Sequence, residues 1–256
     1  MKEILTTTVF ILYFLMTSLA LGGIRKMDIY KQDYRRALNA GTDAAVKATS
    51  YKDEVDLSGL SFGFGEGLEN TNNIRVDKDE ALNWFYTLFY NNLGMQDNIS
   101  SQQALKKYIP MKCIVEFNKI SIADVHDNWV VEKEFIINYN GRDYLFTLSD
   151  QVQDVGSKEW IKDTSIGLTK EKRQELISAF IKNEIEDFLN NRENMESNTY
   201  YTINLGINDL DQMHKTVGGS NVIVFAEGLP LPSLNWFNPK EKFYAFSIGG
   251  SEIIRK

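Results

Sequence analysis

The stretch ILTTTVFILYFLMTSLALGGI, residues 4–24, contains 21 residues and no charged side chain. As an α-helix it is long enough to cross a hydrocarbon core of about 30 Å, so we predict a single transmembrane helix. A cleaved signal peptide is the alternative, because Lys2 precedes the stretch and Ser18-Leu19-Ala20 fits the small-x-small cleavage rule. The stretch is longer than a signal-peptide core of about 7–15 residues, which favours an uncleaved anchor.

The helical pattern continues beyond the uncharged stretch. Small or apolar residues recur at steps of three and four up to Ala48, and residues 1–48 contain no proline. One continuous helix is therefore predicted, with a transmembrane half and an amphipathic half that projects from the membrane. Ala37, Gly41 and Ala45 form a small-residue face on the projecting half. This face either binds a helix of another subunit or packs on the globular part of the same chain.

The flanking charges give two interpretations of the orientation. Lys2 alone precedes the uncharged stretch, whereas five basic residues follow it: Arg25, Lys26, Lys31, Arg35 and Arg36. The positive-inside rule would place the rest of the chain in the cytoplasm. A very short hydrophilic tail before the apolar stretch is instead typical of a signal-anchor, whose body is exported. We expect an extracytoplasmic body at the cell membrane.

Residues 49–256 predict an α+β head of helices packed on an antiparallel sheet. Asp77 and Glu80 predict the start of one helix by a capping box, and Gly94 predicts its end. Thr169 is the expected N-cap of a second long helix with an apolar stripe. A short helix is expected at 101–108, and Asn140-Gly141 predicts a type I′ hairpin. Strands are expected at 112–117, 120–125, 129–139, 142–148, 199–205, 221–226 and 242–248.

The sequence contains no pattern that predicts catalysis. The chain carries a net charge of −7, which argues against nucleic-acid binding, and its single cysteine, Cys113, excludes an intramolecular disulfide. The two histidines, His126 and His214, are far apart, and metal-ligand, nucleophile and phosphate-loop motifs are missing from the sequence. We therefore predict no catalytic residue, no cofactor and no metal site.

One proline-rich segment is a candidate contact surface. The sequence GLPLPSLNWFNPKEK, residues 228–242, contains two prolines that prevent it from joining a central strand. It also carries large apolar side chains, which fold back onto the core or contact a partner. The candidate contact residues are Leu229, Leu231, Trp236 and Phe237.

Parts of the chain resemble two known families. The N-terminal helix with Asp43-Ala44-Ala45-x-x-Ala48, followed by an α+β head, resembles the pseudopilin-like (TadE-type) subunits of Tad and type IV pilus systems. The chain has no glycine-ended hydrophilic leader and no glutamate at the fifth apolar position, so prepilin-peptidase cleavage is not expected. The segments ALNWFYTLFYNNLG (81–94), Tyr108-Ile109-Pro110, FAEGLP (225–230) and Gly249-Gly250-Ser251 resemble an uncharacterised membrane-anchored family of Gram-positive bacteria. Both resemblances imply membrane anchoring and an envelope role.

The prediction for function combines the anchor with the helix face. We expect a non-catalytic, single-pass structural or assembly subunit of a cell-envelope machine of the pilus or secretion type. Its partners would be the membrane and other subunits that pack against the helix. The alternative is an anchored sensor or ligand-binding domain, which would need a concave apolar pocket with convergent polar groups. The sequence leaves open the particular assembly or ligand and the oligomeric state.

Overall fold

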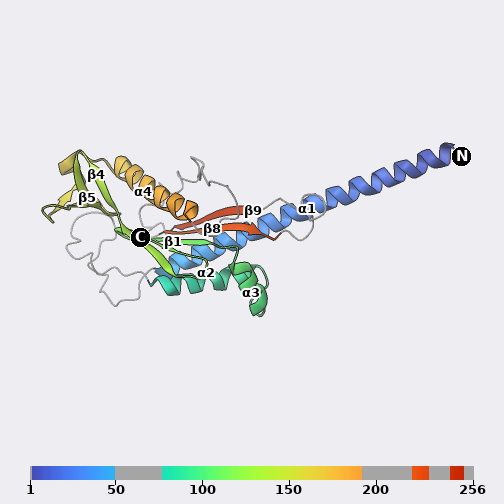
Figure 1. Cartoon of the computed structure of the whole chain (residues 1–256), viewed down its shortest axis with the longest axis horizontal. Helices are drawn as coiled ribbons and strands as arrows, with labels where there is room; N and C mark the ends of the chain where they lie inside the picture. Colours follow the sequence, from blue (N-terminus) through green and yellow to red (C-terminus); the bar gives the residue numbers. More distant parts are fainter. Residues whose placement is uncertain (1, 50–76, 192–220, 231–242, 251–256) are drawn as a thin grey trace, which may run out of the picture.

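The computed structural model describes residues 2–49, 77–191, 221–230 and 243–250, without the side chains of residues 2–9, 12, 20, 48, 49, 243 and 250. The described chain is α+β, as predicted, with a long N-terminal helix that extends out of a mixed body (Figure 1). The expected strand at 199–205 and the segment 50–76 lie outside the described residues. The helices are α1 (Lys2–Thr49), α2 (Lys78–Asn92), α3 (Ile99–Lys106), the short 3₁₀ helix η2 (Asp163–Ile166) and α4 (Lys170–Asn190).

The strands form two antiparallel sheets, so the prediction of one sheet was wrong. The five-stranded sheet has the order β3-β2-β1-β8-β9, and the four-stranded sheet has the order β4-β5-β6-β7. In the first sheet the strands are β1 (Met111–Val115), β2 (Lys119–Ala123), β3 (Trp129–Glu134), β8 (Asn221–Leu229) and β9 (Phe243–Gly250). In the second they are β4 (Ile136–Tyr139), β5 (Arg142–Phe146), β6 (Gln151–Asp154) and β7 (Trp160–Lys162).

Phe135 explains the division into two sheets. Residues 129–139 were expected to form one strand, but Phe135 separates β3 from β4 and is fully buried. Its N–H donates to Asn118 O at 2.9 Å, and its carbonyl accepts from Phe146 N at 2.9 Å. The chain therefore passes from one sheet to the other at a core aromatic residue, without a turn signal in the sequence.

The local signals for helix and hairpin ends are confirmed. Asp77 Oδ1 accepts a hydrogen bond from Glu80 N at 3.0 Å, and Thr169 Oγ1 accepts one from Lys172 N at 3.2 Å. Asn140 and Gly141 have φ values of 52° and 80°, as a type I′ turn requires. These ends depend on neighbours in the sequence, which is why the sequence could predict them.

The five-stranded sheet lies between two hydrophobic clusters. Side chains alternate along β1, so Cys113 faces one cluster and Ile114 faces the other. The first cluster joins this sheet to α4 and to the four-stranded sheet. The second cluster joins its opposite face to α1, α2 and α3 (Figure 1).

The C-terminal half of α1 belongs to the second cluster. Its buried residues follow steps of three and four along one side of the helix: Tyr34, Ala37, Leu38, Gly41, Thr42, Ala45 and Val46. This side packs on α2, β8 and β9 of the same chain. The small-residue face is therefore internal: of the two alternatives, the structure shows packing on the globular part of the same chain and does not leave Ala37, Gly41 and Ala45 exposed to helices of other subunits. Residues 34–46 belong to the head rather than to a separate projecting unit.

Candidate functional site

The expected contact loop is described only at its start. Leu229 is buried at the end of β8, where a register shift between Glu227 and Leu229 accompanies a φ of 70° at Gly228. This irregularity directs Leu229 into the second cluster, so at this residue the segment folds back onto the core, the first of the two alternatives, and Leu229 is not exposed to a partner. Leu231, Trp236 and Phe237 lie outside the described residues.

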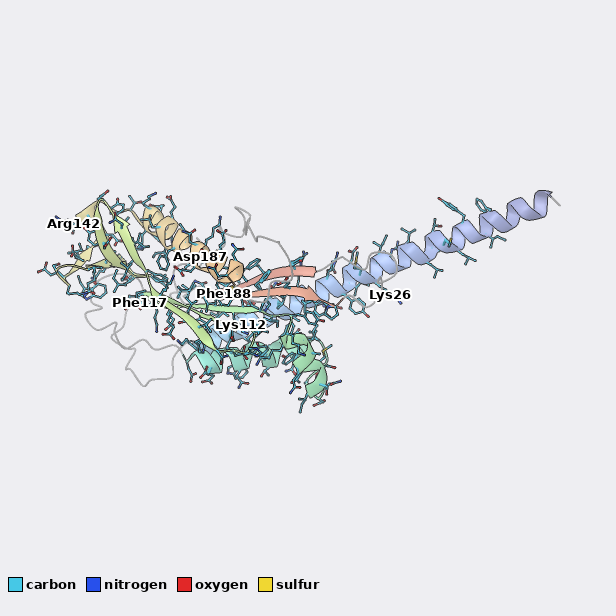
Figure 2. The ribbon with its side chains drawn as sticks, in the orientation of Figure 1. Lys26, Lys112, Phe117, Arg142, Asp187 and Phe188 are labelled. Atoms are coloured by element: carbon cyan, nitrogen blue, oxygen red, sulfur yellow. The ribbon has the colours of Figure 1, made fainter. Side chains whose placement is uncertain are left out.

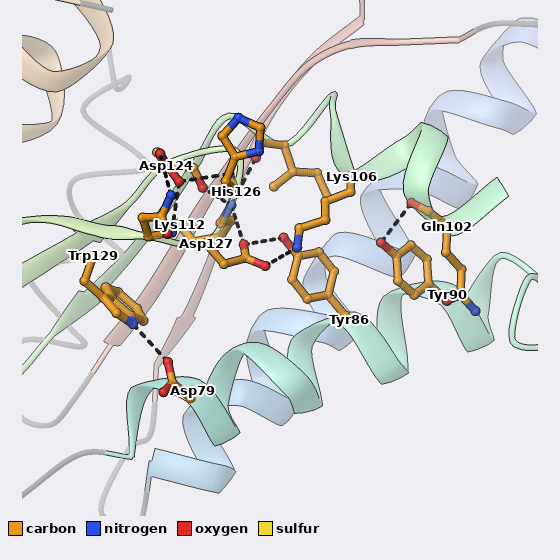
Figure 3. Close-up of polar contacts among 12 residues, drawn as sticks. Asp79, Tyr86, Tyr90, Gln102, Lys106, Lys112, Asp124, His126, Asp127 and Trp129 are labelled. Atoms are coloured by element: carbon orange, nitrogen blue, oxygen red, sulfur yellow. Dashed lines mark hydrogen bonds and ion pairs between the residues drawn. The ribbon is translucent and has the colours of Figure 1, made fainter. Parts of the chain in front are cut away.

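A buried ion-pair cluster joins β1 to the helices that cover it (Figure 3). Lys112 lies in β1 with its side chain fully buried on the side of the second cluster. Its Nζ lies 2.6 Å from Asp127 Oδ1 and also donates to Asp124 O and, at 3.4 Å, to Ile109 O. An ammonium group has three N–H donors, and these three acceptors use all of them.

Asp127 occupies the turn between β2 and β3. Its φ is 66°, and the Asp124 carboxylate stabilises this turn by accepting from His126 N at 2.8 Å and Asn128 N at 2.9 Å. His126 therefore participates in the turn through its backbone. The Asp127 carboxylate also accepts from Tyr86 Oη of α2 at 2.8 Å and forms an ion pair with Lys106 of α3.

The charges of this cluster stabilise one another. Burial lowers the pKa of the Lys112 ammonium, and the neighbouring Asp127 carboxylate acts in the opposite direction. Burial alone would raise the pKa of Asp127, but hydrogen bonds from Lys106, Lys112 and Tyr86 lower it overall. Burial, followed by the charge of Asp127, raises the pKa of Tyr86, and the same causes raise that of Tyr90 to about 12.

A second set of polar contacts joins the start of α2 to β3. Trp129 Nε1 donates to Asp79 Oδ1 at 3.1 Å, and the Lys78 ammonium lies 5.0 Å from the centre of the Trp129 ring. Lys78 also forms an ion pair with Glu132. Together with the hydrogen bond from Tyr86 Oη to Asp127, these contacts hold α2 against the sheet at separate points along the helix.

The geometry of the Lys112 cluster indicates a structural role. The three donors of Lys112 are already occupied, so its Nζ has no direction left for a substrate. One signal in the sequence indicates this cluster: a lysine inside the otherwise apolar run Met111–Val115. The ion pair could not be inferred, because Asp127 lies in a separate turn, far from Lys112 along the chain.

The N-terminal half of α1 has a different surface. It extends away from the body, and the stick view shows its side chains without neighbours from other elements (Figure 2). The exposed fractions of its large apolar side chains range from 47% to 69%. Tyr13, Phe14, Leu15 and Met16 are consecutive, so they complete a helical turn and expose apolar groups on every side. Among the described side chains of this half, the exposed large apolar ones are Phe10, Ile11, Tyr13, Phe14, Leu15, Met16, Leu19, Leu21 and Ile24.

Within the described residues, no helix combines the length and the apolar character that a bilayer crossing requires. The side chains of residues 4–9, 12 and 20 of the uncharged stretch are outside that description. In the same part of the chain, His, Cys, Asp and Glu do not gather in a group of three or more that could hold a metal ion.

Comparisons with protein families, curated proteins and solved structures gave no significant match to this chain. The resemblances to pseudopilin-like subunits and to a Gram-positive membrane-anchored family remain predictions from the quoted residues. Function therefore has to be inferred from the surfaces of the molecule, above all from α1.

Proposed function

We propose that this chain is a non-catalytic, single-pass membrane-anchored subunit of a cell-envelope assembly, with the N-terminal half of α1 as its anchor. One observation carries the proposal: large apolar side chains surround this half of the helix and remain exposed. A helix that is apolar on all sides needs an apolar environment, either a protein core or a lipid bilayer. The uncharged length of residues 4–24 suits the bilayer.

The energetics favour insertion over exposure to water. Removing one large apolar side chain from water contributes about 1.5–3 kcal/mol, and nine such residues are exposed on this half of α1. In the body, by contrast, the buried apolar residues form two internal clusters. The contrast between the two halves of the molecule supports a division into an anchor and a head.

The continuity of α1 supports a structural role. The helix runs from Lys2 to Thr49 without interruption, and its C-terminal half packs in the core. A single rigid helix thus supplies both the anchor and one core element of the head, and no flexible linker separates them. A subunit built in this way would hold its head at a fixed height and direction relative to the membrane. Contacts with other subunits would then involve the exposed half of α1, since the Ala37–Gly41–Ala45 face is internal.

Alkaline carbonate extraction of membranes tests the anchor. The full-length chain should remain in the membrane pellet. Leu15 lies near the middle of the uncharged stretch, where an arginine costs about 2.5–3.5 kcal/mol. Leu15→Arg should therefore shift protein to the soluble fraction. Ile99→Arg is the matched control, because Ile99 is 68% exposed on α3, away from α1, and should leave the protein in the pellet.

Two outcomes would contradict the proposal. Full-length wild-type chain in the carbonate supernatant would exclude an integral anchor. A mature soluble form that begins at Leu21 would identify the apolar stretch as a cleaved signal peptide. The orientation is tested separately, because protease added to intact cells should degrade an extracytoplasmic head and should spare a cytoplasmic one.

A further inference from the structure

Two basic residues directly follow the uncharged apolar stretch of α1. Arg25 and Lys26 come after Ile24, the last residue of that stretch, and both side chains are exposed, as are Ile29 and Tyr30 one turn further on. In the described part of the chain, no hydrogen bond or ion pair joins the side chain of either one to another residue. Their charges are thus available to a partner outside the chain.

The helix geometry places these two residues at a defined level. Helix α1 continues through them without a break, and the first buried residue among those whose side chains the structure describes is Tyr34. With a rise of 1.5 Å per residue, Tyr34 lies about 12 Å further along the axis than Lys26. Arg25 and Lys26 lie within about 3 Å of the end of the uncharged stretch. If that stretch fills the hydrocarbon core, both residues lie in the headgroup layer, which is roughly 5–8 Å thick.

The charge distribution indicates which class of lipid this segment would bind. The whole chain carries a net charge of −7, yet residues 25–36 contain five basic and only two acidic residues. An anionic surface would repel the chain as a whole and attract this segment. Arg and Lys near such a surface bind phosphate groups of anionic lipids, whereas a zwitterionic surface offers them no net attraction.

We propose that Arg25 and Lys26 bind the phosphate groups of anionic phospholipids in the leaflet from which α1 emerges. This inference rests on the proposed anchoring of α1 and adds the class of lipid that surrounds it. Free phosphate or a soluble anion would not explain why the charges directly follow the apolar surface. A lipid has both parts of the required chemistry, since its chains contact the apolar side chains and its headgroup contacts the two basic ones.

Local lipid enrichment around the reconstituted protein tests the proposal. The full chain carrying Ile29→Cys is labelled with a maleimide donor fluorophore and reconstituted into phosphatidylcholine vesicles. Ile29 is exposed and lies one helical turn beyond Arg25 and Lys26, while the native Cys113 is fully buried and should not react. Energy transfer is then measured to trace phosphatidylglycerol or to trace phosphatidylcholine, each with the same acyl-chain acceptor.

The expected result is an enrichment of phosphatidylglycerol over phosphatidylcholine on the order of fivefold, which falls at high salt. Arg25→Gln with Lys26→Gln should abolish the enrichment. Arg142→Gln with Lys170→Gln is the matched control, because both side chains are exposed on the head and Arg142 lies at the end opposite the anchor (Figure 2). This control should retain the enrichment.

The failures of the two proposals can be told apart. A chain that does not incorporate into vesicles of either composition would overturn the membrane anchor itself. Incorporation with equal transfer to both lipids would overturn the anionic-lipid inference and leave the anchor standing. Enrichment that persists after Arg25→Gln and Lys26→Gln would overturn the assignment to these two residues.

Discussion

Gly41 of α1 lies directly against Phe85 of α2. A Cβ atom on Gly41 would be 2.7 Å from Phe85 Cδ2 and 2.9 Å from the Phe85 carbonyl oxygen. Real Cβ atoms do not approach other atoms this closely, so only glycine allows the two helices to meet here. Phe85 also stacks on Phe89, with ring centroids 5.7 Å apart, which leaves its ring little freedom to move away. The contact fixes the direction of α1 relative to the head.

Replacing Gly41 with leucine should therefore lower the stability of the monomer. Overpacking of a core typically costs about 1–3 kcal/mol, and the nearby Phe85 carbonyl places this position toward the upper end. The measurement is the free energy of unfolding or the Tm of the full chain in detergent. Gly22→Leu is the matched control, because a Cβ on Gly22 would have no other atom within 4 Å.

A different outcome for Gly41→Leu would restore the assembly hypothesis. The face would bind another subunit if two results were obtained together. The Tm of Gly41→Leu would equal that of Gly22→Leu, and cysteines placed at Ala37 or Ala45 would cross-link between chains with Gly41 present but not with Gly41→Leu. Ala37 and Ala45 are both fully buried within the chain, so we expect no cross-linking in the folded protein.

The two partners of the buried ion pair should respond unequally to mutation. Asp127→Asn leaves the fully buried Lys112 ammonium without its counter-charge, and an uncompensated buried charge costs about 3–5 kcal/mol. Lys112→Met removes the buried charge itself and leaves Asp127 paired with Lys106 and Tyr86. We therefore expect Asp127→Asn to reduce the free energy of unfolding more than Lys112→Met does. The reverse order, measured by denaturant unfolding, would show that the pair does not carry this stability.

The contribution of Asp127 should also depend on pH. Its pKa is lowered in the folded protein, so the ionised form stabilises the fold fully above the unfolded-state pKa of about 3.9. This contribution is lost as the pH falls through the lower folded-state pKa. The difference in unfolding free energy between wild type and Asp127→Asn should consequently shrink between pH 7 and pH 3. A difference that stays constant over this range would mean that the charge of Asp127 is not involved.

Local and distant contacts explain which features the sequence could predict. Asp77, Thr169 and Asn140-Gly141 act on residues within one turn of themselves, so their roles were visible in the sequence. The division of the sheet at Phe135 depends on hydrogen bonds to residues 118 and 146, which no local pattern encodes. The small-residue face of α1 was likewise recognised as a groove. Its occupant, Phe85, could not be identified because many helices could fill such a groove.

Truncation of α1 should separate its two halves. Deleting residues 1–25 removes the exposed apolar residues from Phe10 to Ile24 and leaves in place the residues of α1 that the structure describes as buried, from Tyr34 to Val46. The shortened chain should fold and need no detergent. Deleting residues 1–48 should instead expose the face of the five-stranded sheet that Leu38 and Val46 cover, together with one side of α2. Burial of each large apolar side chain contributes about 1.5–3 kcal/mol, and a domain has only about 5–15 kcal/mol of net stability. The longer deletion should therefore aggregate or lose its cooperative thermal transition in circular dichroism. A cooperative, monomeric head that begins at residue 49 would show that α1 is an appendage and would contradict its place in the core.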